Sequence, residues 1–84
     1  MFELHEAGDY LFHENDSSEA AFLIASGEYL VLKESAEDTA VATLAAGALT
    51  GVAGLLQHGR YNAALRTVNR GESWRLSKAG IERL

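Results

Sequence analysis

The sequence predicts a small antiparallel β protein, either a sandwich or a barrel. Short apolar runs recur along the chain, polar or glycine-containing turns close most of them, and the runs follow one another at close, regular spacing. The chain has 84 residues, enough for one small domain, so residues 1–84 are predicted to form a single unit.

The first half of the chain contains four predicted strands. A polar turn follows the first of them, and Asn15 in this turn is a residue type that tolerates a positive φ. Ser26 and Gly27 separate the second strand from the third, and an acidic segment, residues 34–39, separates the third from the fourth. Because like charges repel, that segment is predicted to be a solvated loop. The four strands are expected at residues 10–12, 21–25, 28–32 and 41–44.

The second half contains two more predicted strands, at residues 63–69 and 73–76, with a turn at 69–72 between them. Trp74 and Leu76 are two apart and therefore share one face of the last strand. A thin β core needs large side chains, so Trp74 is predicted to be a core residue or an interface anchor. Ser77 is a suitable N-cap for a short C-terminal helix, in which Ile81 and Leu84 would lie on one face.

Residues 45–59 break the strand pattern, because they are rich in glycine and alanine and show no alternation. Their middle, residues 53–57, is predicted to form one helical turn. Glycines that enter a helix allow the backbone N–H groups to approach an anion, although a simple tight connection gives the same composition.

Composition excludes several classes of protein. Twelve acidic residues against seven scattered basic ones give a net charge of −5, which argues against nucleic-acid binding. Without cysteine there is no disulfide or iron–sulfur cluster. No apolar stretch is long enough to span a membrane, and the first residues are acidic where a signal peptide is basic. The expected location is the cytoplasm.

Catalytic and metal-binding patterns are not found. The three histidines, His5, His13 and His58, lack the spacing of a metal site, and no serine stands in a G-x-S-x-G motif. There is also no P-loop. His58 could donate a hydrogen bond to an anion or could be a solvated loop residue. We therefore expect a protein with no enzymatic activity, no metal and no cofactor.

Four segments in order resemble the cyclic nucleotide-binding domain, the β-roll of catabolite-activator-type regulators, protein kinase A regulatory subunits and gated channels. Residues 7–16, AGDYLFHEND, are similar to its opening hairpin, and residues 22–31, FLIASGEYLV, to its next pair of strands. Residues 45–51, AAGALTG, and the last strand with residues 77–84 match the later part of the family pattern. The resemblance implies an antiparallel double-stranded β-roll or jelly roll with a one-turn cassette helix and a short C-terminal helix.

The family's ligand chemistry resides in its phosphate-binding cassette, approximately G-E-[LM]-A-L followed by P-R-x-A-[TS]. In that cassette, arginine gives the cyclic phosphate a charged bidentate donor and glutamate accepts from the ribose hydroxyl. Aligned without gaps, this chain has Val52 in the glutamate place, Arg60 in the proline place and Tyr61 in the arginine place. The ligand-binding candidates that follow are Gly51, Val52, Ala53, Gly54, Leu55, Arg60, Tyr61, Asn62 and Ala63.

Two interpretations of this altered cassette remain open. In one, the domain binds nothing, or binds a different small anion; in the other, Arg60 turns into the site and weak cyclic-nucleotide binding persists. Both make the protein a non-catalytic regulatory or sensor module. The alternative is a protein-interaction or oligomerisation module, with a homodimer as a possible form. The family normally continues into a long helix that covers the base, and its absence from these residues would leave an exposed apolar strip available for self-association.

Overall fold

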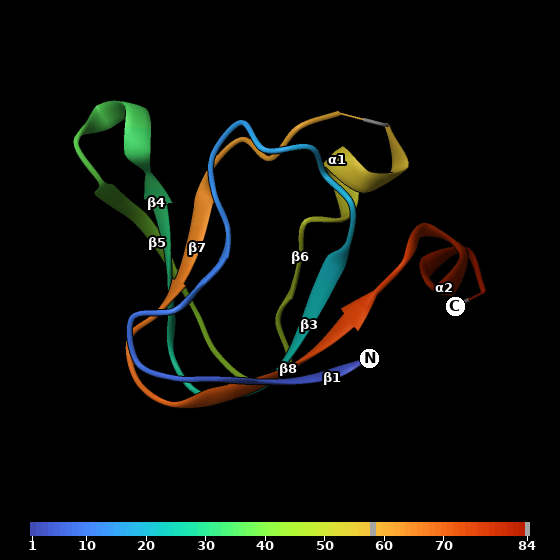
Figure 1. The fold of residues 1–84 in the computed structure, drawn as a ribbon, viewed down its shortest axis with the longest axis horizontal. Coiled ribbons are helices and arrows are strands. Elements are labelled where there is room, and N and C mark those ends of the chain that lie inside the picture. The colour runs from blue at the N-terminus through green and yellow to red at the C-terminus, as the bar shows by residue number, and fades with distance from the viewer. Residues whose placement is uncertain (58, 84) are drawn as a thin grey trace.

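Two four-stranded antiparallel sheets face each other in the computed structural model, which describes residues 1–57 and 59–83 (Figure 1). Eight strands alternate with turns, and the helical segments are short. The strands are β1 (Phe2–His5), β2 (Tyr10–Phe12), β3 (Ala21–Ser26), β4 (Tyr29–Lys33), β5 (Thr39–Leu44), β6 (Leu49–Thr50), β7 (Ala64–Thr67) and β8 (Gly71–Leu76). The helical segments are the 3-10 turn η1 (Glu34–Ala36), α1 (Val52–Leu56) and α2 (Lys78–Glu82).

The chain crosses repeatedly between the two sheets, which makes the fold a β-roll. One sheet has the strand order β1-β8-β3-β6 and the other has the order β2-β7-β4-β5. Only β4 and β5 are both consecutive in the chain and paired as a hairpin within one sheet. Figure 1 shows α1 and α2 at the end of the first sheet, away from the β4–β5 hairpin. The predicted antiparallel fold class is confirmed.

The core lies between the sheets and is built from alternating positions of the inner strands. Phe22, Ile24, Tyr29, Leu32 and Leu65 are almost completely buried. A buried polar pair joins them, in which His5 Nε2 lies 2.8 Å from Ser73 Oγ. The pair satisfies two polar groups that would otherwise be costly to bury.

Most of the predicted strands are confirmed with small changes in their ends. β3 extends one residue further than predicted, β4 begins and ends one residue later than predicted, and β7 is shorter than residues 63–69. The predicted turn residue Asn15 has φ 73°, as expected. Ser77 is the N-cap of α2, where its Oγ accepts a hydrogen bond from Gly80 N at 3.1 Å. The predicted position of Leu84 on this helix lies outside the described residues.

Four predictions need correction. The sequence did not indicate β1 or the two-residue strand β6, and β8 begins at Gly71, inside the predicted turn. Of the two roles predicted for Trp74, the core role is wrong, because 45% of its surface is exposed, and the role of interface anchor stays a prediction. The acidic segment is not simply solvated, because Glu34 within η1 binds back to the loop after β2.

Candidate functional site

The segment predicted as a phosphate cassette begins at Gly51, which connects β6 to α1. Gly51 has φ 84°, in the left-handed region that L side chains rarely adopt. A Cβ at this position would lie 3.2 Å from Ala20 O and 3.3 Å from the Tyr61 ring. Both the backbone conformation and the lack of space therefore require glycine here.

Helix α1 is one and a half turns long and is held by a single buried residue. Leu55 is buried, whereas Ala53 and Leu56 are exposed. The helix ends in a tight return of the chain, in which Gly59 N donates to Gly54 O at 2.8 Å. A Cβ on Gly54 would lie only 2.9 Å from the Ser18 Oγ, so this second glycine allows the helix to approach the loop before β3.

A cavity of about 310 Å³ lies between the start of α1 and the segment 59–62 that leads to β7. Six of the nine predicted ligand-binding residues line it, together with Gln57 and Gly59. The six are Gly51, Ala53, Gly54, Arg60, Tyr61 and Asn62. The other three predicted residues do not line the cavity: Val52 is half-buried in α1, and Leu55 and Ala63 are buried. The predicted His58 lies outside the described residues.

Tyr61 is the only buried aromatic residue that lines this cavity among the residues the structure describes. Its hydroxyl donates to Ala20 O at 2.6 Å and accepts from Ala20 N at 3.2 Å. Its ring stacks on Phe12 with centroids 3.8 Å apart and an interplanar angle of 10°. The hydroxyl proton is therefore already engaged with the backbone, and the side chain is part of the core.

Arg60 is the only cation that lines the cavity within residues 1–57 and 59–83. Its Nη1 donates to Asn15 O at 2.9 Å, and its backbone forms an isolated bridge with Ser17. The residue is exposed, and a guanidinium carries five N–H donors, so further donors remain. Arg60 thus stands at the rim of the cavity, bonded to the loop after β2.

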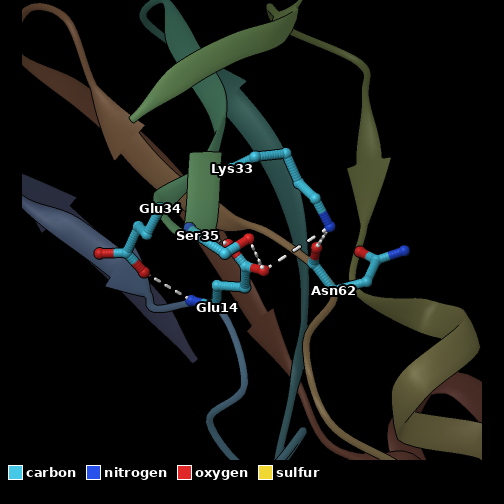
Figure 2. Close-up of polar contacts among 5 residues, drawn as sticks. All are labelled: Glu14, Lys33, Glu34, Ser35 and Asn62. Atoms are coloured by element: carbon cyan, nitrogen blue, oxygen red, sulfur yellow. Dashed lines mark hydrogen bonds and ion pairs between the residues drawn. The ribbon is translucent and has the colours of Figure 1, made fainter. Parts of the chain in front are cut away.

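A second cavity, of about 370 Å³, shares Tyr61 and Asn62 with the first and extends toward η1. Its wall is a polar network that Figure 2 shows. Both carboxylate oxygens of Glu14 accept from Ser35, from the backbone N at 3.0 Å and from Oγ at 2.7 Å. Lys33 Nζ lies 3.7 Å from Glu14 Oε2 and donates a hydrogen bond to Asn62 O.

The same network lowers the pKa of two carboxyl groups. Hydrogen bonds from the backbone and side chain of Ser35, followed by the charge of Lys33, hold the pKa of Glu14 below its usual value. The hydrogen bond from His13, at 2.8 Å, and the backbone N–H of Glu14 lower the pKa of Glu34. Both groups are therefore carboxylates at neutral pH, and they fasten η1 to the loop after β2.

Sequence reasoning did not find this network. Its members are separated by about twenty residues along the chain, and hydrogen bonds of that range leave no local pattern. One signal was available: Lys33 is the only lysine or arginine among the first 59 residues, and it directly precedes the acidic segment. Within the described residues, no group of histidine and acidic side chains could hold a metal ion.

Residues 3–84 match the family model described as Cyclic nucleotide-binding domain. The chain belongs to the cyclic nucleotide-binding domain family. No curated protein sequence matches the chain. Among the helices of the described residues, none is long and apolar enough to cross a membrane.

Solved structures agree with this family assignment. The Catabolite Activator Protein of Thermus thermophilus superposes with a TM-score of 0.89 at 25% identity, over 99% of this chain and 40% of that one. A regulatory subunit of a cAMP-independent protein kinase A from Trypanosoma brucei gives a TM-score of 0.89 at 18% identity, over 99% of this chain and 30% of that one. The cAMP-bound form of the EAL enzyme Bd1971 superposes with a TM-score of 0.89 at 21% identity, over 99% of this chain and 23% of that one. The chain thus spans less than half the length of these three proteins.

Compared with the cassette of the cyclic nucleotide-binding domain, this cassette keeps the glycine turn and the short helix but not the charged side chains. Val52, in the glutamate place, offers no hydrogen-bond acceptor on its side chain. Tyr61, in the arginine place, has its hydroxyl bonded to Ala20. Arg60 is one residue away, in the place of the family's proline, and faces Asn15.

Proposed function

We propose that this domain is a non-catalytic regulatory module in which cyclic-nucleotide binding is weakened or lost. The observation that carries this proposal is the state of Tyr61, whose ring and hydroxyl are both used by the fold. Its side chain therefore contributes neither charge nor a free donor to a phosphate in the cavity.

We also propose that the protein is located in the cytoplasm, with which an acidic chain without cysteine is compatible.

Electrostatics of the cavity support the proposal. A cyclic phosphate is a monoanion and is held best by a charged, bidentate donor. Among the described residues that line the cavity, Arg60 alone carries a positive charge, and its Nη1 is already bonded to Asn15 O. Lys33, on the wall of the neighbouring cavity, faces the carboxylate of Glu14. The cavity can therefore bind only a small anion near Arg60, and only weakly.

The absence of a side-chain acceptor for the ribose hydroxyl is also expected to weaken cyclic-nucleotide binding. Val52 cannot accept from a ribose hydroxyl, so a cyclic nucleotide would bury that donor without a partner or leave it in water. Regulatory proteins with this β-roll include one described as cAMP-independent, which supports a role without the usual ligand.

Isothermal titration with cAMP, cGMP and inorganic phosphate tests the proposal. The expected result for the wild-type protein is no saturable heat, or a Kd of about 1 mM or weaker, equivalent to about 4 kcal/mol of binding free energy or less. Arg60→Ala should remove whatever phosphate binding is present. Arg70→Ala removes one exposed positive charge from the turn before β8 and is the matched control. A micromolar Kd for either nucleotide would contradict the proposal.

A second candidate function is a protein-interaction or oligomerisation module without a ligand. One observation favours it: apolar side chains are exposed on β1, β8, β3 and β6 of the first sheet. A homodimer is the simplest form of such an assembly.

A further inference from the structure

An apolar row crosses the outer face of the first sheet from one edge to the other. Phe2 is paired with Trp74, Trp74 with Leu23, and Leu23 with Leu49. Directly opposed residues of antiparallel strands project from the same face of a sheet. These four side chains, here called the outer row, therefore lie side by side across all four strands.

Each member of the outer row is exposed, although on the two central strands, β8 and β3, residues next to the row are buried. The exposed fractions are 44% for Phe2, 45% for Trp74, 37% for Leu23 and 47% for Leu49. By contrast, Ser73, Phe22 and Ile24, on the opposite face, are almost completely buried. The rings of Phe2 and Trp74 contact each other edge to face, with centroids 4.9 Å apart. The row is thus an ordered apolar surface and not a set of scattered residues.

The surroundings of the outer row are also poor in charge. Leu4 and Ala25, which follow two residues after Phe2 and Leu23 on the same face, are exposed and apolar. Glu72 is the one charged residue at the strand positions that alternate with the buried face, and its Oε1 accepts from Ser26 Oγ at 3.0 Å. A face with a single charged side chain, and that one acidic, suits an apolar protein surface better than a nucleic acid or an anionic membrane.

We infer that the outer row is the contact surface of a homodimer, in which a second copy of this chain packs its own outer row against it. A two-fold axis parallel to the strands, between β8 and β3, places Phe2 against Leu49 of the second copy and Trp74 against Leu23 of the second copy. Each large aromatic side chain then meets a smaller aliphatic one, which is the arrangement that fills space between facing layers. The interface is isologous, as in most dimers.

The exposed area agrees with a weak dimer. Aromatic side chains have about 150–250 Å² of surface, so Phe2 and Trp74 together expose on the order of 200 Å². With the leucines and Ala25, each copy offers on the order of 500 Å² of apolar surface, which lies in the range of patches that function as contacts. Two such faces bury on the order of 1,000 Å² in total, the size of weak and transient interfaces.

The inference deepens the second candidate function proposed above and is independent of ligand binding in the cassette. The single tryptophan of the chain, Trp74, belongs to the outer row and reports on its burial. Sedimentation velocity and tryptophan emission should therefore be measured together, from about 1 µM to about 1 mM protein. We expect a monomer that becomes a dimer with increasing concentration, with a parallel blue shift of the emission.

Two variants keep the reporter and disrupt the row. Leu23→Lys, at its centre, should raise the dimer dissociation constant by about tenfold or more, the effect of losing a central interface residue. Leu49 lies on the edge strand β6, and Leu49→Lys replaces Leu23→Lys as the test variant if circular dichroism shows that Leu23→Lys does not fold. Val41→Lys places the same charge on β5 of the other sheet, at a residue 56% exposed, and should leave the dimer unchanged.

Several results would overturn the inference. These are a wild-type protein that stays monomeric up to about 1 mM, a dimer whose Trp74 emission does not change with concentration, or equal effects of Leu23→Lys and Val41→Lys. A monomer whose Trp74 emission is blue-shifted at every concentration would show that the row is covered within one chain. None of these outcomes would alter the nucleotide titration, so failure of the dimer and failure of the regulatory proposal are distinguishable.

Discussion

The two hydrogen bonds between the Tyr61 hydroxyl and Ala20 make Tyr61→Phe a sharp test of how the cassette is held. The substitution keeps the ring on Phe12 and removes only the hydroxyl oxygen. It leaves the Ala20 N–H and C=O without this partner in a buried region. A hydrogen bond contributes about 1 kcal/mol net, and an unsatisfied buried group costs about 1–3 kcal/mol.

We therefore expect Tyr61→Phe to lower the free energy of unfolding by about 2 kcal/mol, which is a large part of the stability of so small a domain. The midpoint of thermal unfolding should fall by roughly 10 °C. Urea denaturation followed by Trp74 fluorescence and by circular dichroism measures the change. Both probes should agree if unfolding is two-state.

Tyr10→Phe is the matched control for this experiment. Tyr10 is on β2, at the surface, and its hydroxyl has no hydrogen-bond partner among the described residues. Its substitution should change the free energy of unfolding by less than about 0.5 kcal/mol. If Tyr61→Phe were as mild as Tyr10→Phe, the hydrogen bonds between the Tyr61 hydroxyl and Ala20 would not be stabilising the cassette, and the reasoning about the engaged proton would fail.

Three further predictions follow from the same site. Tyr61→Arg should strengthen phosphate binding in calorimetric titration. It should also lower the free energy of unfolding by more than Tyr61→Phe does, because it removes the ring that stacks on Phe12. An unchanged phosphate affinity would show that charge alone does not restore binding by the cassette. Gly51→Ala should lower the free energy of unfolding, measured by urea denaturation, by about 1–2 kcal/mol or more. An L residue in the left-handed conformation has this cost, and the close contact of its Cβ with Ala20 O adds to it. An unchanged free energy of unfolding would contradict the geometry of Gly51. The pKa of Glu14 and of Glu34 is lowered in the folded state, so their contribution to stability is complete above the ordinary glutamate pKa of about 4.3 and is lost as the pH falls through the lowered values. Glu14→Gln should flatten this acid branch of the stability curve, whereas Glu19→Gln, at an exposed residue of the loop before β3, should leave it intact.

Local patterns determined which strands the sequence could predict. The apolar run that became β3 and the run that became β4 are separated only by Ser26, Gly27 and Glu28, and both were found. The first strand was not, because its pattern is inverted: Phe2 and Leu4 point outward, and His5 is buried against Ser73. Alternation alone does not say which face is inside.

The site was predictable only in part for a related reason. Gly51 and Tyr61 could be placed by their similarity to the family's cassette, since that pattern is local in sequence. The partner of the Tyr61 hydroxyl, Ala20, is 41 residues away, and a backbone group carries no signature in the sequence. Arg60 and its acceptor, Asn15 O, are also far apart along the chain, by 45 residues. Only the structure therefore shows which groups these side chains bind.

The position of Tyr61 also has an evolutionary consequence. In the gap-free alignment, the place of the family's arginine is taken by Tyr61, which joins the segment before β7 to Ala20, the residue before β3. A single substitution of Tyr61 by arginine would add charge but lose the stacked ring and both hydrogen bonds to Ala20, so it would be selected against unless another substitution first stabilised the fold. In the gap-free alignment, a position that binds ligand in the family is therefore occupied here by a structural side chain, and a change to arginine passes through a less stable protein.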